Sequence, residues 1–236
     1  MIREHEFNSR WWGGRAGVLD RLDFFELSDA EQKSALEAFE WVELRAPLED
    51  APLAAIQRSG FFQVDVQIPF RIALSRVPSS PSLSEFTVER ASETPFTIAD
   101  DELAPFDKER YRHLPGVTPE RLTRRYGQWS RLLLESDPAW CLRISSNGRV
   151  QGWFLSQNTR DGLALELAML HREGTISGTY VYQKALLTYA ADARLGFARF
   201  SVANPAVLNI YARFGAQFFA PAGSWFWIRT PSASRA

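Results

Sequence analysis

Three residues in the second half of the chain are of types that can take part in acid–base chemistry. Glu166 is a carboxylate within an apolar stretch, where it is either a general base or an ordinary outward-facing strand residue. His171 follows five residues later and can bind phosphate, act as a base or lie exposed. Tyr211 lies seven residues after Asn204, so it is either a proton donor or a packing residue of one helix. Their chemistry depends on the elements that position them.

Composition excludes several classes of protein. The chain has 236 residues, enough for one large domain or two small ones, and 45% of them are hydrophobic. Lys and Arg number 27 against 28 Asp and Glu, a balance that argues against a nucleic-acid binder. The single cysteine excludes an intramolecular disulfide and a cysteine-rich zinc site, and the three histidines lack metal-ligand spacing. We therefore expect no bound metal and no nucleic acid.

The sequence also bears on the compartment. It starts with charged residues and no apolar core of a signal peptide. No apolar run reaches the ~18 residues needed to span a membrane. We therefore expect a cytoplasmic protein with no membrane partner.

A run rich in proline and serine, residues 77–84, predicts a linker between two domains. Residues 1–76 predict a small α/β N-terminal domain, and residues 85–236 predict the second domain. Ser28 and Glu31 have the spacing of a helix-capping box. We expect the first domain to contain a loop at 7–14, a helix from 28 to about 40, a strand at 41–46, a helix at about 50–59 and strands within 61–75.

Turn and cap residues divide the second domain into elements. Asn147 and Gly148 predict a tight hairpin between two strands. Thr118 followed by Pro119 predicts one helix start, and Asn204 followed by Pro205 predicts another. The expected elements are a strand at 86–90, helices at about 98–110 and 119–135, strands at 139–145, 150–157 and 163–170, a helix at about 180–194, a strand at 197–203, a helix ending at 214–215, and strands around 218 and 225–228.

This order of elements, with Asn204, Val207, Tyr211 and Gly215 at their spacing, resembles the GNAT superfamily of acyl-CoA-dependent N-acyltransferases. The resemblance covers about residues 85–230. It implies an α/β (α+β) fold with a mixed, mostly antiparallel sheet flanked by helices, here preceded by the small α/β domain. It also implies acetyl-CoA as the acyl donor and a small-molecule amine as the acceptor.

The resemblance implies roles for the titratable residues. Tyr211 occupies the position of the acid that protonates the departing thiolate. A phenol has a pKa of about 10 and a thiol a pKa of about 8.5, so this proton transfer is only mildly uphill. Glu166 is the candidate catalytic base, in a strand where members of this family place an acid or a bound water. The only cysteine, Cys141, lies in a predicted strand, which disfavours a covalent acyl-cysteine route.

The resemblance also implies where the cofactor binds. One strand is expected to part from its parallel neighbour, so that the backbone of Ala168, Met169, Leu170 and His171 pairs with the pantetheine arm like an added strand. The diphosphate is expected at the N-terminus of the next helix. That cradle comprises Gly174, Thr175, Ile176, Ser177, Gly178, Thr179 and Tyr180.

The cradle departs from the family pattern, because only Gly178 matches it and Tyr180 stands where a small residue is usual. A degenerate domain that has lost acyl-CoA binding therefore stays an alternative. Two asparagines are further cofactor candidates. Asn204 either contacts the cofactor or only caps its helix, and Asn209 either reaches the pantetheine arm or lies on a solvated face.

Short aromatic segments resemble the dTDP-fucosamine acetyltransferases, a subgroup that acts on nucleotide-linked amino sugars. They lie at residues 9–13, 60–65, 109–111 and 126–129. The resemblance implies that Arg110 contacts phosphate, for which the arginine fork is suited. Aromatic rings offer faces for stacking on a base or sugar. The substrate-binding candidates are Trp11, Trp12, Arg110 and Tyr126.

The sequence therefore predicts an acetyl-CoA-dependent N-acetyltransferase that acts by direct attack of an amine. The expected acceptor is a dTDP-linked amino-dideoxy sugar used for cell-surface polysaccharide. The alternatives are transfer to another small amine or a protein N-terminus, and a non-catalytic GNAT binding module. A homodimer is compatible with the sequence. The sugar isomer, the acyl chain length and the oligomeric state stay open.

Overall fold

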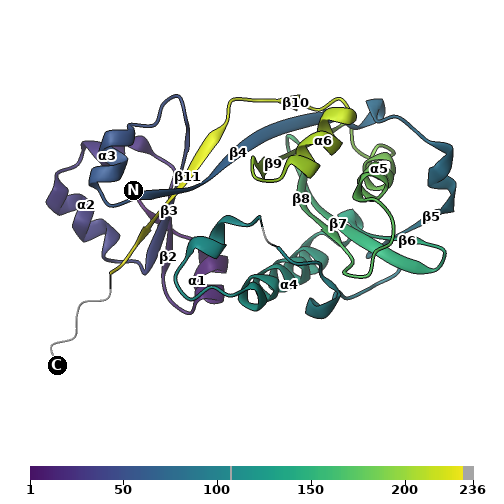
Figure 1. Ribbon diagram of the computed structural model, residues 1–236, viewed down its shortest axis with the longest axis horizontal. Coiled ribbons are helices and arrows are strands. Elements are labelled where there is room, and N and C mark those ends of the chain that lie inside the picture. Colours follow the sequence, from purple (N-terminus) through teal and green to yellow (C-terminus); the bar gives the residue numbers. More distant parts are fainter. Residues whose placement is uncertain (107, 231–236) are drawn as a thin grey trace. The chain divides into compact units, whose positions relative to one another are not determined.

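The computed structural model describes residues 1–106 and 108–230. Contacts divide the chain into two compact units, and Figure 1 labels their elements. Unit 1 comprises Met1–Ile68, Ser201–Ala203 and the residues from Ala220 onward, and unit 2 comprises Pro69–Phe200 and Asn204–Phe219. This division differs from the predicted boundary at residues 77–84. It falls inside one long strand, and the C-terminal strand belongs to unit 1.

Unit 1 is a small α/β unit built from the start of the chain and its C-terminal strand. Its strand order is β1-β2-β3-β11-β4, in which β2 and β3 are parallel and the pairs of β11 with β3 and β4 are antiparallel. Its elements are β1 (Arg3–Glu4), α1 (Glu6–Trp12), β2 (Ala16–Leu19), α2 (Asp29–Leu36), β3 (Trp41–Pro47), α3 (Leu53–Arg58), the first part of β4 (Phe62–Ala73) and β11 (Ala222–Ile228).

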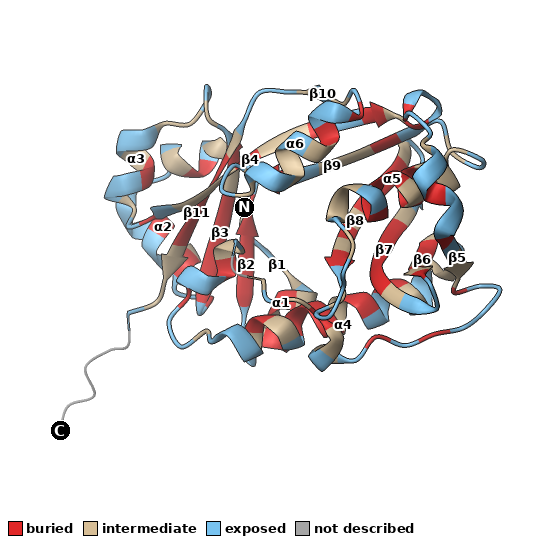
Figure 2. Ribbon diagram, turned by 45° about the vertical axis from the view of Figure 1, so that its right-hand side comes forward, coloured by how far each residue is buried: buried red, intermediate tan, exposed pale blue. Residues whose placement is uncertain are grey.

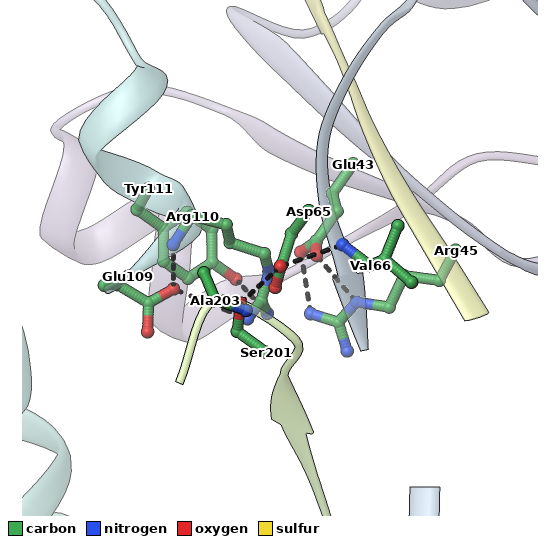
Figure 3. Close-up of polar contacts among 9 residues, drawn as sticks. All are labelled: Glu43, Arg45, Asp65, Val66, Glu109, Arg110, Tyr111, Ser201 and Ala203. Atoms are coloured by element: carbon green, nitrogen blue, oxygen red, sulfur yellow. Dashed lines mark hydrogen bonds and ion pairs between the residues drawn. The ribbon is translucent and has the colours of Figure 1, made fainter. Parts of the chain in front are cut away.

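Alternation along β3 gives the unit 1 sheet two different faces. Val42 and Leu44 belong to an apolar core that also takes in Leu36 of α2 and Ile56 of α3. The opposite face carries Glu43, which is fully buried and forms an ion pair with Arg45 at 2.7 Å (Figure 3). Figure 2 shows the buried character of β3 and β11.

Unit 2 holds the longer succession of elements. Its strand order is β4-β9-β8-β7-β6-β5, and the short β10 pairs with β4. The strands are the second part of β4, β5 (Phe86–Arg90), β6 (Cys141–Ser146), β7 (Arg149–Thr159), β8 (Gly162–Leu170), β9 (Leu195–Ser201) and β10 (Gln217–Phe218). The helices are α4 (Pro119–Ser136), α5 (Gly178–Tyr189) and α6 (Pro205–Arg213).

The hairpin and cap predictions for unit 2 are confirmed. Asn147 and Gly148 join β6 to β7, and both have positive φ, at 51° and 73°. Thr118 caps α4, and Asn204 caps α6 by accepting a hydrogen bond from the Val207 N–H at 3.3 Å. Gly215, just after α6, has a φ of 77°, a conformation that glycine adopts without strain. The mixed sheet flanked by helices is the predicted fold class.

Two local predictions are wrong. Residues 6–12 form α1 rather than a loop, and α1 ends at Gly13 with a φ of 84°. The predicted helix at 98–110 is replaced by short 3-10 turns at Asp100–Glu102 and Arg110–His113. Pro105 is the physical reason, because the residue before a proline is driven away from the helical region.

The predicted linker also has structure. Pro81–Glu85 forms a 3-10 helix in which Leu83 is buried. The side chains of Gln183 and Lys184 on α5 donate hydrogen bonds to the Pro78 and Leu83 carbonyls. This segment is therefore packed on α5 rather than acting as a spacer. Over the described residues, no helix combines the length and the apolar character that crossing a membrane requires.

Candidate active site

Strand β8 is paired along one edge and opens along the other. On one edge it pairs with β7 along its whole length, from Gly162 to Leu170. On the other edge it pairs in parallel with β9 at only two positions, Leu163 with Gly196 and Ala164 with Phe197. The parting of these two strands was predicted for this point of the chain. It leaves the second half of β8 with backbone groups that β9 does not use.

Alternation of the backbone decides which of these groups face the opening. One residue past the last β7–β8 pair, the His171 N–H donates to the Gln151 carbonyl of β7 at 2.9 Å. His171 therefore directs its backbone groups toward β7, and so does Met169, two residues earlier. Ala168 and Leu170 therefore direct theirs toward the β9 side. Of the predicted edge residues 168–171, only these two offer backbone groups to an added strand.

One end of the open edge is already occupied. The Ala104 N–H donates to the Leu170 carbonyl at 3.2 Å, and the Arg172 N–H donates to the Glu102 carbonyl at 2.7 Å. Leu103 forms an antiparallel bridge with His171. A segment that the sequence predicted to be helical thus lies along the last residues of the edge, and Ala168 remains as its most open position.

Glu166 lies where β8 begins to part from β9. The β7–β8 register shifts here, because Ser156 pairs with Leu165 and Leu155 pairs with Leu167. Glu166 is therefore the extra residue of a β-bulge, a device that re-aims a side chain. Burial raises the pKa of the Glu166 carboxyl, and the positive charge of Arg199 on β9 acts in the opposite direction. A carboxylate with a raised pKa is suited to accept a proton.

Tyr211 lies on α6 in a cluster of aromatic rings. Its ring centroid is 4.0 Å from that of Phe70, 5.6 Å from that of Tyr182 and 6.4 Å from that of Phe200. Its exposed fraction is 3%. Burial raises the pKa of the phenol well above its usual value, with the neighbouring tyrosines adding to the increase. The hydroxyl therefore keeps its proton at neutral pH, while giving it up becomes more uphill than for a free phenol.

The loop between β8 and α5 contains the predicted diphosphate cradle. Its N–H groups are partly engaged, because Thr175 and Ile176 both donate to the Gln151 side-chain oxygen, at 3.0 and 3.2 Å. Ser177 caps α5 by accepting from the Thr179 N–H at 3.4 Å. Within the described part of the chain, the N–H groups of Ser177 and Gly178 have no hydrogen-bond acceptor. These two adjacent donors at a helix N-terminus suit an anionic group.

Of the remaining cofactor candidates, one is engaged in a helix cap and two are exposed. Asn204 has its side-chain oxygen on the Val207 N–H, which is the capping role weighed from the sequence. Asn209 is exposed on α6, and Tyr180 is exposed on α5. Tyr180 lies near Phe86, with ring centroids 6.4 Å apart. Their contacts with a cofactor stay predictions.

His171 and Cys141 are tied into the local structure. The His171 ring accepts a hydrogen bond from the Glu173 N–H at 3.0 Å and lies 4.0 Å from the Glu102 carboxylate. Burial raises the pKa of the Cys141 thiol to about 12, so the thiolate needed for acyl transfer is scarce at neutral pH. This agrees with transfer by direct attack.

The predicted acceptor-binding residues lie in both units, and each group is described by itself. In unit 1, Trp11 and Trp12 lie in α1, and the Trp12 ring meets Trp41 edge-on with centroids 6.2 Å apart. In unit 2, Tyr126 is buried and stacks on Phe106 with centroids 3.7 Å apart. These rings have packing roles within their units, and their contact with a substrate stays a prediction.

Arg110 is the cationic member of that set. Its side chain is 13% exposed and forms an ion pair with Glu109 at 3.4 Å. Its guanidinium also donates to the Tyr111 hydroxyl at 3.2 Å and lies over the Tyr111 ring, as Figure 3 shows for the two hydrogen-bonding side chains. The guanidinium is thus held in a defined orientation by its two sequence neighbours.

Sequence reasoning missed three parts of this site. Gln151, the segment at 102–104 and Arg199 were not singled out, because each acts through contacts that are distant in sequence. A polar residue within a strand that begins just after a hairpin turn was the only signal for Gln151. Nothing in the local pattern indicated its partners.

Among the comparisons with known proteins, only the one with solved structures finds matches. No protein-family model matches the sequence. No curated protein matches it either. Among solved structures, a GCN5-related N-acetyltransferase from Sphaerobacter thermophilus matches with a TM-score of 0.51 and 15% identity, covering 80% of this chain and 59% of that one. The chain thus spans less than two thirds of that protein's length.

Two further structures match over more of their length. A GCN5-related N-acetyltransferase from Kribbella flavida has a TM-score of 0.51 and 14% identity, covering 93% of this chain and 82% of that one. A conserved protein of unknown function from Staphylococcus epidermidis has a TM-score of 0.57 and 13% identity, covering 92% and 84%. The chain therefore has the fold of the GCN5-related N-acetyltransferases. At these identities the likeness concerns the fold alone.

Proposed function

We propose that this protein is an acetyl-CoA-dependent N-acetyltransferase of the GNAT class. The observation that carries the proposal is the parting of β8 from β9 after two paired positions. The open edge leads directly into a loop and helix N-terminus with two N–H groups that no described residue engages. A thioester carrier with an extended amide-containing arm and a diphosphate matches this succession of strand edge and helix N-terminus.

Acetyl-CoA would supply an activated acyl group, and residues of this chain would bind and orient it. The backbone groups of Ala168 would hold the arm in an extended form, and its N–H could polarise a carbonyl oxygen. Such a preorganised donor is worth ~3–4 kcal/mol in favourable cases. The diphosphate would lie on the N–H groups of Ser177 and Gly178.

Proton transfer is assigned to two side chains. Glu166, at the bulge with a raised pKa, would accept the proton of the attacking amine, directly or through water. Tyr211 would return a proton to the thiolate that leaves. General acid–base help of this kind is worth ~10²–10⁴ in rate. The base assignment predicts that kcat/KM rises with pH through the raised pKa of Glu166.

The acceptor is proposed to be the amine of a dTDP-linked amino-dideoxy sugar. Support comes from the short aromatic resemblances and from the fixed guanidinium of Arg110, which is the type of group that binds phosphate. Another small amine or a protein N-terminus would use the same transfer chemistry. We propose that the protein works in the cytoplasm, and a homodimer is the assembly to test first.

The test has two stages. Isothermal titration and native mass spectrometry measure whether the purified protein binds coenzyme A, and a thiol-release assay then measures transfer to a panel of amines. The panel contains dTDP-linked 4-amino sugars, free amino sugars, polyamines and N-terminal peptides, with hydrolysis in the absence of amine as the blank. Absence of coenzyme A binding would refute the proposal. Binding without transfer to any amine would favour the non-catalytic module.

A further inference from the structure

We propose that Gln151 is a positioning residue that holds the loop before α5 in the shape that receives a diphosphate. This inference rests on the proposed function. Gln151 lies near the start of β7 and is 3% exposed, whereas the loop residues Arg172–Thr175 are exposed. A buried anchor therefore holds an exposed loop.

The contacts of Gln151 reach both ends of the loop. Its backbone carbonyl accepts the His171 N–H at 2.9 Å, where the loop leaves β8. Its side-chain oxygen accepts the N–H groups of Thr175 and Ile176, at 3.0 and 3.2 Å, just before α5. Its side-chain nitrogen donates to the Arg149 carbonyl at 3.2 Å, which fixes the orientation of the amide. Each polar atom of the amide group thus has a partner.

The loop forms a tight turn that packs against Gln151. The Gly174 N–H donates to the His171 carbonyl at 2.9 Å. A Cβ atom at Gly174 would lie 3.0 Å from the His171 carbonyl oxygen and 3.2 Å from that of Gln151. Such close backbone approach requires glycine or a shift of the loop. The turn therefore packs closely against the Gln151 backbone at a position where a side chain would be crowded.

The anchored N–H groups immediately precede the two N–H groups at the helix N-terminus. Thr175 and Ile176 are held by Gln151, and Ser177 and Gly178 follow in sequence at the start of α5. Fixing the first pair restricts the backbone that carries the second pair. The family-like loop pattern is met here only at Gly178, so we infer that Gln151 supplies the order that the missing pattern residues would otherwise provide.

The same contacts would also allow Gln151 to hinder diphosphate binding, and the experiment below distinguishes the two roles. The Gln151 oxygen could compete with a phosphate oxygen for the Thr175 and Ile176 N–H groups. Removing it would then strengthen coenzyme A binding. A positioning role predicts weaker binding, because a loop that is ordered only about a tenth of the time lowers the apparent affinity about 10-fold.

The experiment compares Gln151→Met with Gln157→Met, a control on the same strand. Gln157 donates to the Asp137 carboxylate at 3.1 Å, and none of the hydrogen bonds among the described residues joins it to the loop. Isothermal titration measures the affinity of each variant for coenzyme A and for pantetheine, which lacks the diphosphate. We expect Gln151→Met to weaken coenzyme A binding about 10-fold while pantetheine binding and the control variant stay unchanged. Unchanged or tighter coenzyme A binding would overturn the proposal, as would equal weakening of both ligands.

A measurement without ligand tests the anchor by itself. Amide hydrogen exchange at Thr175 and Ile176 should be slow in the wild type and fast in Gln151→Met. Fast exchange in the wild type, or unchanged protection in Gln151→Met, would contradict the anchor. If the wild type showed this protection but bound no coenzyme A, the proposed function would fail while the anchoring contacts stood.

Discussion

The two edges of strand β8 show how one strand can serve both the fold and a site. Toward β7 the ladder continues to Leu170, so every second residue has its backbone groups engaged. Toward β9 the ladder ends after Ala164. Met169 and Ala168 are sequence neighbours, yet one belongs to the paired edge and the other to the open edge. The comparison teaches that the proposed function depends on backbone direction more than on side-chain type.

The largest expected effect comes from replacing those two neighbours by proline, which removes one N–H from one edge at a time. Ala168→Pro should leave the β7 ladder intact and lower kcat by about 10²–10³, because the N–H of the open edge is the proposed carbonyl donor. Met169→Pro should instead lower the free energy of unfolding by about 1–3 kcal/mol, since it leaves a buried ladder acceptor without its donor. Chemical denaturation and steady-state kinetics measure both. Similar destabilisation by both prolines, with no separate kinetic effect, would remove the distinction between the edges.

The next effect concerns the phenol proposed to act beside the open edge. Tyr211→Phe should lower kcat about 10²-fold with coenzyme A affinity unchanged, because the hydroxyl is the proposed proton donor. The control is Tyr182→Phe, whose ring lies 5.6 Å from that of Tyr211 and is buried with it. Single-turnover kinetics and titration measure the two quantities. If both variants slowed the reaction equally, or neither did, the acid role of Tyr211 would be wrong.

Glu166, which lies where β8 parts from β9, allows a test by the free energy of unfolding. Because the pKa of Glu166 is raised in the folded state, its ionised form destabilises the fold above that pKa, and the cost vanishes below the usual value of 4.5. Glu166→Gln should therefore raise the free energy of unfolding at pH 7, since the amide carries no charge to desolvate, and should have little effect near pH 4.

Glu89 is the control, because its pKa is shifted in the opposite direction to that of Glu166. A hydrogen bond from Arg143 lowers the pKa of the Glu89 carboxyl, so its ionised form stabilises the fold above the usual pKa. Glu89→Gln should lower the free energy of unfolding at pH 7, and the loss should fade as the pH falls. Urea denaturation across this range measures both variants. A Glu166→Gln effect with the sign of Glu89→Gln would show that Glu166 is stabilised in its charged form.

Much of unit 2 could be predicted because its signals are local. The Asn147-Gly148 turn, the Thr118 and Asn204 caps and Gly215 each act on their immediate neighbours in sequence. The position at which β8 parts from β9 was expected from the family resemblance rather than from any property of the strand itself. The roles of Glu166 and Tyr211 remain predictions.

The missed features depend on contacts between distant segments. The pairing of β11 with β3 and β4 places the end of the chain in unit 1, and no local pattern indicates it. The strand predicted at 41–46 is present as β3, but no local pattern indicated that Glu43 would be buried and paired with Arg45. The segment at 102–104 was assigned to a helix because its pairing with the end of β8 cannot be seen in its own sequence.

A substitution in the segment at 102–104 has the smallest expected effect, and it tests whether this segment competes for the open edge of β8. Ala104→Pro removes the N–H that donates to the Leu170 carbonyl, and Leu103 before it already has the extended backbone that proline requires, with φ −78° and ψ 135°. The free energy of unfolding should fall by only about 0.5–1.5 kcal/mol, the usual net value of one hydrogen bond. Coenzyme A affinity should stay within about 2-fold, because the proposed pairing site is Ala168 and not Leu170. A much tighter complex in this variant would show that residues 102–104 compete for the edge, and that the free form of the protein is partly closed.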